Sequence, residues 1–339
     1  MKKLRFVWID DQPNKVEPYR AAIEHGIQNP KLTASIESIE VKTGLLDELQ
    51  KWTEGKRNKP PDLFIIDHVF NPTLPFKLNG SSVAHLLRNT FPATPMVCVT
   101  AKYDSPKSFD QDDLSEYTAI FAYSQLSQSL DDIFAIAHDF PKLAPGASKP
   151  KEHLLTCLKA PQRDREQLLA LLPEELQNPT HAATQHRMAR WIYGVLLPRP
   201  GFLYDRLHVA TLLGLTLKGF EKVEERFTKA LYKGAFATRK TPHWWLSEVH
   251  RLLFGGAVEA PSNVPQLAGR ALPGIDHEDF SVCYVSKKSD PPPDVIAAAD
   301  ATKGAELRVV RREFAKQHPN DPGTTPGFET RYVLAKKRA

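Results

Sequence analysis

Short apolar runs that end in polar residues recur along the first 140 residues of the chain. Residues 4–9 form the first of these runs, and Asp10 and Asp11 follow it directly. Continuous apolar runs of this length are typical of strands that are buried on both faces of a parallel sheet. The same pattern predicts further strands at residues 62–67, 95–100 and 119–123, and alternating apolar and polar residues predict one at 34–41.

Between these expected strands, apolar residues recur at helical spacing. Helices are predicted at residues 16–27, 45–52 and 81–88. A last helix is expected to open at Ser129, because a hydroxyl cap is followed there by two acids in the first turn. Strands that alternate with helices predict an α/β fold with a five-stranded, doubly wound parallel sheet. Any ligand is then expected at the carboxyl ends of the strands.

Polar residues that could carry chemistry stand at three of those strand ends. Asp10 and Asp11 follow the first strand, Asp67 ends the third, and Thr100 ends the fourth. Carboxylates that converge repel one another unless a cation joins them, and Mg²⁺ is the hard ion that prefers such oxygen ligands. A carboxylate beside Mg²⁺ can attack a phosphoryl group, and a neighbouring hydroxyl can bind the phosphoryl oxygen.

This set of residues resembles the receiver domain of two-component response regulators, over about residues 1–142. The resemblance rests on Asp10-Asp11, Asp67, Asn79-Gly80 at the start of the next helix, and Thr100-Ala101. It implies a receiver-like (flavodoxin-like) fold in which Asp67 accepts phosphate and Asp10, Asp11 and Asp67 hold Mg²⁺. It also implies that Thr100 and the aromatic Phe121 sense the phosphoryl group.

Two features depart from the family. The family's lysine after strand five aligns with Ser124 here, and losing a charge-assisted hydrogen bond of that kind removes roughly 1.5–3 kcal/mol. In addition, thirteen positions separate Asp67 from Gly80, with Pro72 and Pro75 between them. This longer loop borders the expected acceptor and could gate access to it.

The resemblance implies a phosphoprotein in phosphorelay signal transduction, either a regulator or a phosphate sink, with a histidine kinase or a phosphotransfer protein as partner. No enzyme activity beyond self-phosphorylation is expected. The missing lysine favours an alternative, a phosphorylation-independent adaptor that docks in a larger complex. A third interpretation is structural, because acids at strand ends often only cap helices or face solvent.

The second half of the chain has a different composition. Residues 1–150 carry 17 Lys and Arg against 19 Asp and Glu, whereas residues 151–339 carry 28 against 21. We therefore expect a receiver-like domain at 1–142, a linker rich in proline and small residues at 143–150, and a basic output domain at 151–339. Helices are predicted at 166–172 and 185–197, and strands at 281–285, 306–314 and 331–334, so this domain is predicted to be mostly helical α+β.

Residues 204–231 have the spacing of a helix-turn-helix, with Gly214 at the turn and Thr216 as the cap of a second helix. Such a helix would present cations able to contact the phosphates of DNA: Lys218, Lys222, Arg226 and Lys229. It also carries Glu221, Glu224 and Glu225, which phosphates repel. The same spacing occurs in ordinary helical packing, so both interpretations stand.

Cysteine usage and hydropathy indicate the cellular compartment in which the chain is expected. Cys98, Cys157 and Cys283 are odd in number and far apart, which disfavours a disulfide scaffold and suits a reducing cytoplasm. The sequence contains no run of about 18 apolar residues, so no membrane span is predicted. The pattern leaves open whether the chain forms a homodimer.

Overall fold

A computed structural model describes residues 2–12, 14, 17–25, 32–70, 78–101, 115–144, 150–177, 182–255, 264–288, 295–300, 306–319 and 327–335. By its internal contacts the chain divides into two compact units, each described separately below. The first unit contains residues 1–157, 173–195 and 235–240, and the second contains residues 158–172, 196–234 and 241–339.

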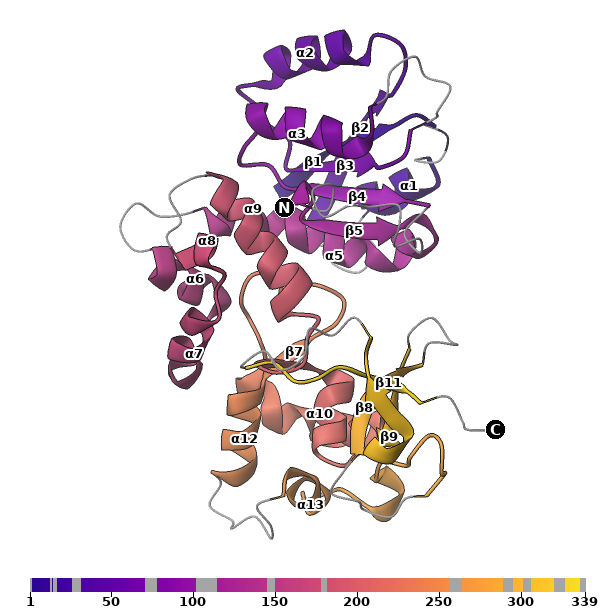
Figure 1. Ribbon diagram of the computed structural model, residues 1–339, viewed down its shortest axis with the longest axis vertical. Coiled ribbons are helices and arrows are strands. Elements are labelled where there is room, and N and C mark those ends of the chain that lie inside the picture. The colour runs from indigo at the N-terminus through magenta and orange to yellow at the C-terminus, as the bar shows by residue number, and fades with distance from the viewer. Residues whose placement is uncertain are drawn as a thin grey trace. The chain divides into compact units, whose positions relative to one another are not determined.

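The first unit is built on a parallel sheet of five strands in the order β2-β1-β3-β4-β5 (Figure 1). The strands are β1 Lys2–Asp10, β2 Leu32–Glu40, β3 Leu63–Asp67, β4 Met96–Thr100 and β5 Ala119–Ala122. The strand order steps to one side of β1 and then to the other, which is the doubly wound topology that the sequence pattern predicts.

Helices cover both faces of this sheet, because successive residues of each strand point to opposite sides. Val7 and Ile9 of β1 pack in one core with residues of α2 (Leu45–Lys56) and α3 (Gly80–Thr90). On the other face, the rings of Phe6 and Phe134 lie 5.3 Å apart. Trp8 stacks there on Tyr19 of α1 (Glu17–His25). Phe134 belongs to α5 (Leu126–Asp139), which begins three residues before the expected Ser129.

The first compact unit is larger than the predicted domain 1–142. It also contains α8 (Glu174–Gln177), α9 (Ala182–Trp191) and most of a π-helical turn, Ile192–Leu196. One continuous helix was expected at residues 185–197, where α9 and the π-helical turn lie. The side chain of Gln185 donates to the carbonyl of Phe140 at 2.7 Å, and the hydroxyl of Tyr193 donates to Asp132 Oδ2 at 2.7 Å. The composition of residues 143–150 indicated a linker after the first domain. Contacts such as these two, between residues distant in the sequence, cannot be predicted from local composition.

The second unit is mixed in structure, as the pattern predicted. Two short strands, β6 Leu203–Asp205 and β7 His243–Trp245, form an antiparallel pair. Trp244 is buried in the core of this unit with Phe220 and Phe227. The helices of this unit are α7 Arg165–Ala170, α10 Arg206–Leu212, α11 Leu217–Val223, α12 Leu246–Phe254 and α13 Pro265–Arg270. A further helix, α6 (Pro150–Leu158), spans the boundary between the units.

A four-stranded sheet, ordered β10-β11-β8-β9, completes the second unit. Its strands are β8 Val295–Asp300, β9 Glu306–Arg311, β10 Ala315–Gln317 and β11 Tyr332–Leu334. The strand expected at 281–285 was wrong: these residues lie in a coil and a turn, where the amide of Tyr284 donates to the carbonyl of Val309 at 2.8 Å. Among the described residues, none of the helices has the length and apolar character needed to cross a membrane.

Candidate functional site

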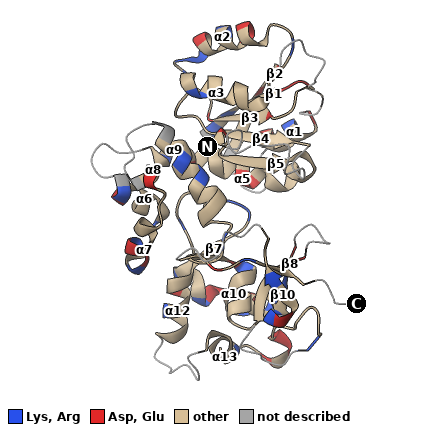
Figure 2. Ribbon diagram, in the orientation of Figure 1, with Lys and Arg blue, Asp and Glu red and all other residues tan. Residues whose placement is uncertain are grey.

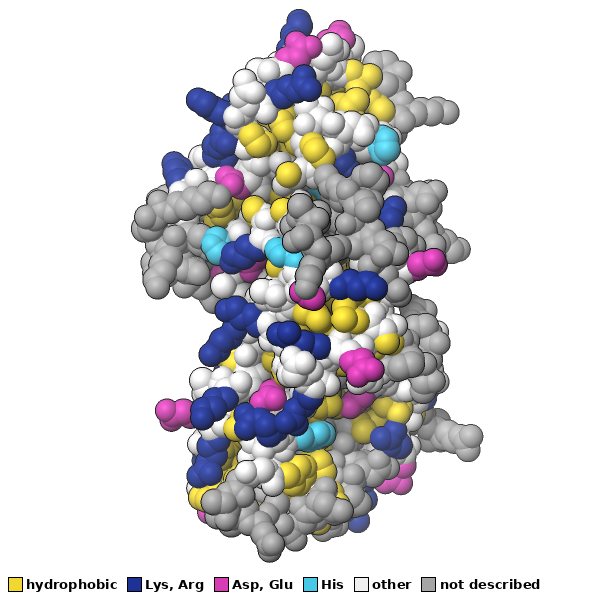
Figure 3. Space-filling view, turned by 90° about the vertical axis from the view of Figure 1, so that its left-hand side faces the viewer, with side chains coloured by type: hydrophobic (Ala, Val, Ile, Leu, Met, Phe, Trp, Pro, Cys, Tyr) yellow, Lys and Arg dark blue, Asp and Glu magenta, His cyan; other side chains and the backbone are white. Residues whose placement is uncertain are grey.

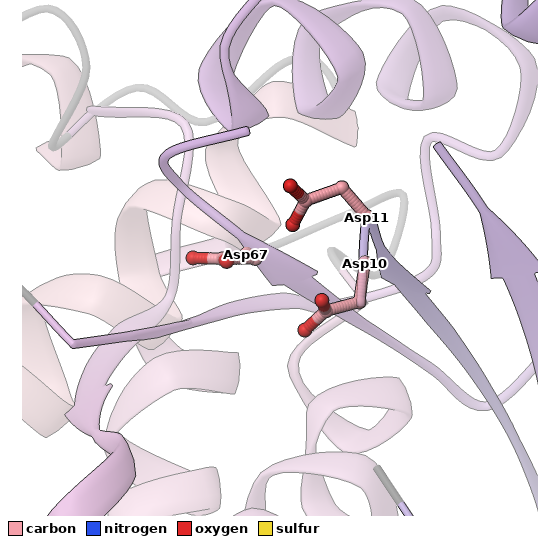
Figure 4. A group of neighbouring side chains, drawn as sticks. All are labelled: Asp10, Asp11 and Asp67. Carbon is pink, nitrogen blue, oxygen red and sulfur yellow. The ribbon is translucent and has the colours of Figure 1, made fainter. Parts of the chain in front are cut away.

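Three carboxylates meet at the carboxyl ends of β1 and β3. Each of Asp10, Asp11 and Asp67 offers one oxygen, and these oxygens lie within 4.8 Å of one another. Asp10 and Asp67 are buried, with 2% and 3% of their surface exposed, whereas Asp11 is partly exposed. Figure 4 shows Asp10 and Asp11 at the end of one strand and Asp67 at the end of the next. The sequence prediction that these side chains come together is therefore met by the geometry.

The strand pairing explains why they meet. Ile9 of β1 lies opposite Ile66 of β3, so the next residues, Asp10 and Asp67, end these two strands side by side. The amide of Gln12 donates to Asp10 Oδ1 at 2.7 Å, and the amide of Val69 donates to Asp67 Oδ1 at 3.3 Å. These backbone donors hold both carboxylates at the strand ends.

Thr100 and Phe121 follow on the neighbouring strands. Val99 of β4 lies opposite Asp67, so Thr100 is one residue beyond that pairing, and it is 1% exposed. Phe121 of β5 pairs with Val99, and its ring lies 6.2 Å from the ring of Tyr193. Thr100 therefore stands at the same end of the sheet as the three carboxylates, with Phe121 one strand further along.

The electrostatics of the three carboxylates favour a cation. Three like charges within 4.8 Å repel strongly, since water is largely excluded from Asp10 and Asp67. All the offered ligand atoms are carboxylate oxygens, the donors that Mg²⁺ prefers over the nitrogen and sulfur ligands of softer metals. The donor set fits Mg²⁺, which Asp10, Asp11 and Asp67 would hold.

Tyr123 is the residue that the sequence analysis missed. Its hydroxyl donates to Asp10 Oδ2, and its ring stacks on Trp8, 6.5 Å away. Burial raises the pKa of Tyr123, and the hydrogen bond to Asp10 and the charges of Asp10 and Asp67 raise it further, so the phenol stays protonated. Ser124, aligned with the family's lysine, is exposed in the short 3₁₀ turn that follows β5. Tyr123 was recognisable only by its place just after the fifth strand, at the end where the acids lie.

The close approach of α3 to the end of β3 requires a glycine at position 80. Asn79 caps α3 by accepting from the amide of Ser82 at 2.9 Å, at the helix start where Asn79-Gly80 was expected. A Cβ atom on Gly80 would lie 2.2 Å from the carbonyl oxygen of Asp67 and 2.8 Å from Cα of His68. Only glycine allows α3 to start so close to the acceptor strand. The expected gating loop, with Pro72 and Pro75, lies outside the described residues.

The helix-turn-helix spacing is present, but its second helix is short. Gly214 turns the chain with a φ of 67°, and Thr216 caps α11 by accepting from the amide of Gly219 at 3.0 Å. The α-helix ends at Val223 and continues as a 3₁₀ helix, Glu224–Ala230, instead of reaching residue 231 as an α-helix. In a 3₁₀ helix the side chains turn by a different angle per residue, so the expected cationic face is not continuous.

One of the four expected DNA contacts is engaged within the protein. Lys222 Nζ lies 2.7 Å from Asp279 Oδ2, and this hydrogen bond raises the pKa of Lys222. Lys218, Arg226 and Lys229 are exposed. On the face drawn in Figure 3, Lys and Arg side chains are interspersed with Asp and Glu and do not form one continuous basic patch.

Comparison with known proteins gives similarity to solved structures alone, since neither a protein-family model nor a curated protein matches the chain. The response regulator TrrA from Thermotoga maritima, in complex with Mg²⁺ and BeF, is 20% identical over 38% of this chain and 95% of that chain, with a TM-score of 0.27. The receiver domain of Francisella response regulator 1452 is 15% identical over 40% of this chain and 94% of that chain, with a TM-score of 0.28. The response regulator RcsB of Salmonella typhimurium is 15% identical over 57% of this chain and 94% of that chain, with a TM-score of 0.32. The chain is thus similar to response regulators with receiver domains, but at these scores the alignments carry no argument, and the fold assignment rests on the strand order.

Proposed function

We propose that this chain is a phosphate-accepting signalling protein of a two-component system, with Asp67 as the phosphoacceptor. The observation that supports this most directly is the meeting of the Asp10, Asp11 and Asp67 oxygens within 4.8 Å. A cluster of this kind is costly without a cation, and its place at the carboxyl ends of a doubly wound sheet is where ligands bind in such folds.

The residues around Asp67 divide the chemistry among them. An Oδ atom of Asp67 attacks the phosphorus of a phosphohistidine, the phosphorus–nitrogen bond breaks, and the imidazole leaves with a proton from solvent. The product is an acyl phosphate on Asp67. Mg²⁺ held by Asp10, Asp11 and Asp67 supplies positive charge that offsets the phosphoryl oxygens. The hydroxyl of Thr100 donates to one of those oxygens, and Phe121 responds to the position of Thr100.

The donor of the phosphoryl group in this proposal is a cytoplasmic histidine kinase or phosphotransfer protein, and the chain is either a regulator or a phosphate sink. It turns over no other substrate. Tyr123 cannot replace the charge of the family's lysine, because its phenol is neutral. The acyl phosphate is therefore expected to be held less tightly than it would be beside an ammonium group.

Acetyl phosphate with Mg²⁺, read by intact mass, tests the proposal. The wild-type chain is expected to gain one phosphoryl group, and the gain is expected to disappear with EDTA and in Asp67→Asn. The matched control is Glu54→Gln, which changes an exposed carboxylate of α2 and is expected to be phosphorylated like the wild type. A wild-type chain that gains no phosphoryl group in the presence of Mg²⁺ would overturn the proposal.

One observation favours a second candidate, a phosphorylation-independent adaptor. The hydroxyl of Tyr123 already donates to Asp10, so the acidic cluster has a neutral partner where the family has a cation. In that case acetyl phosphate gives no adduct. Asp67→Asn would then leave the affinity for a docked partner protein unchanged.

DNA binding through residues 204–231 is a weaker proposal, supported by the Gly214 turn and the Thr216 cap. The ion pair of Lys222 with Asp279 and the neighbouring glutamates oppose it. If the proposal holds, DNA affinity falls steeply with salt and falls further in Arg226→Ala. Absence of any DNA complex at low salt would exclude it.

A further inference from the structure

The second unit contains a cavity of about 660 Å³ that the phosphoacceptor site does not use. One wall is formed by β6 and α10, and the other by β8, β9 and the segment around β11. Helix α10 packs against β8, so both walls belong to one folded body. The volume lies within the range of small-molecule sites, roughly 300–1,000 Å³, and far exceeds the space that an inorganic ion needs.

The first wall presents an ordered pair, Asp205 and His208. Asp205 Oδ1 accepts from the backbone amide of His208 at 2.8 Å and lies 2.9 Å from Nδ1 of the same residue. Burial alone would raise the pKa of Asp205, but the hydrogen bonds and the charges of His208 and His243 together lower it to about 2. Asp205 is therefore a carboxylate, and its contacts with the amide and Nδ1 of His208 fix the orientation of this imidazole.

The other wall carries a second carboxylate, in the segment around β11. Glu329 lines the cavity and accepts the hydroxyl of Tyr204, which is itself buried. Carboxylates have several lone pairs, so Asp205 and Glu329 can both accept further hydrogen bonds. These two carboxylates suit ligand groups that donate hydrogen bonds, such as the hydroxyls of a sugar.

The wall around β11 also carries cationic side chains. His318 follows β10 and Arg331 precedes β11, and the amide of His318 donates to the carbonyl of Arg331 at 2.8 Å, so the two residues are neighbours. The guanidinium of Arg312 lies 5.2 Å from the ring centre of Tyr332 and donates to its hydroxyl. Figure 2 shows Lys and Arg gathered on this sheet near β10. Guanidinium groups and a histidine that line one cavity can donate hydrogen bonds to a phosphate.

The cavity also has apolar lining. Val295, Ile296, Ala297 and Leu307, from β8 and β9, line it together with Phe328. A ligand that satisfies the whole cavity needs an anionic end, a hydroxyl-bearing part and an apolar or flat body. Inorganic phosphate lacks the last two, and an unphosphorylated nucleoside lacks the first.

We infer that this cavity binds a phosphorylated sugar compound, with its phosphate against Arg312, Arg331 and His318 and its hydroxyls toward Asp205 and Glu329. Nucleotides and simple sugar phosphates share this chemistry. The apolar lining favours a nucleotide, whose base would lie along it. The second unit would then respond to a small molecule independently of the acceptor site on the first unit.

Calorimetric titration of the full chain tests this inference. The probes are the four ribonucleoside 5′-monophosphates, ribose 5-phosphate, adenosine and inorganic phosphate. At least one nucleotide or ribose 5-phosphate is expected to bind with a Kd below about 1 mM. Binding of a nucleotide but not of ribose 5-phosphate would show that the base is also recognised, and binding of both would show that the phosphorylated sugar suffices.

Two variants assign the binding to the cavity. Arg331→Gln, or Arg312→Gln if the first variant does not fold, is expected to weaken binding at least 10-fold, about 1.4 kcal/mol. Arg57→Gln, which changes an exposed arginine outside the cavity, is expected to leave it unchanged. The inference is overturned if no phosphorylated probe binds, if inorganic phosphate or adenosine binds as tightly as the nucleotides, or if both cavity variants bind normally.

Discussion

Replacing Asp67 with asparagine is expected to stabilise the metal-free protein. Two unit charges 4.8 Å apart in a medium of effective dielectric about 20 repel by about 3.5 kcal/mol. Asp67 has two such neighbours, Asp10 and Asp11, but solvent reaches Asp11 and screens its charge. The amide keeps the size of the side chain and an oxygen that can accept from the amide of Val69. We therefore expect the free energy of unfolding to rise by about 1–3 kcal/mol.

Magnesium is expected to reverse the order of stability of the wild-type protein and Asp67→Asn. A ligand present at a hundred times its dissociation constant stabilises the folded state by about 2.7 kcal/mol, and this gain needs the intact carboxylates. Wild-type protein should thus gain stability on addition of Mg²⁺, whereas Asp67→Asn should gain little.

Urea unfolding at neutral pH, followed by tryptophan fluorescence with EDTA and then with Mg²⁺, measures both effects. Glu54→Gln is the control, since it removes an exposed carboxylate and is expected to change stability by less than about 0.5 kcal/mol. The reasoning is refuted if Asp67→Asn destabilises the protein in EDTA, or if it gains as much from Mg²⁺ as the wild type does.

Two further predictions concern packing and pH. Gly80→Ala is expected to lower the free energy of unfolding by about 1–3 kcal/mol, because its Cβ would lie 2.2 Å from the Asp67 carbonyl oxygen. Gly55→Ala in α2 is the control, because nothing lies within 4 Å of the added Cβ, and it should raise the free energy of unfolding by about 0.5–1 kcal/mol. Urea unfolding measures both changes, and equal effects would contradict the close approach at Gly80. Burial, and then the charge of Arg88, lower the pKa of His186 from 6.5 to about 4. As the pH falls from 6.5 to about 4, His186 therefore binds a proton in the unfolded chain but stays neutral in the folded chain. The free energy of unfolding decreases over that range. His186→Gln should reduce this loss by up to about 3 kcal/mol in unfolding curves measured across the range, and an unchanged pH dependence would exclude His186 as its source.

The hydrophobic pattern by itself determined the parallel sheet and the site at its edge. Apolar runs buried on both faces specify strands, and the intervening helical periods force right-handed crossovers, so the carboxyl ends must meet. Asp10, Asp11 and Asp67 are predictable because each directly follows or ends such a run. The cap at Asn79 and the turn at Gly214 are predictable for a similar reason, since their signals are local.

Contacts between residues distant in sequence were decided only by the tertiary structure. Tyr123 reaches Asp10 across more than a hundred residues, and the alignment of Ser124 gave no sign of it. Lys222 carries the same charge whether it faces DNA or Asp279, and only the fold brings residue 279 to it. The cavity of the second unit likewise depends on α10 packing against β8, an arrangement set by the shapes of the buried side chains. Periodicity records which face of an element is buried, but the partner on that face is chosen by packing, which involves many residues at once.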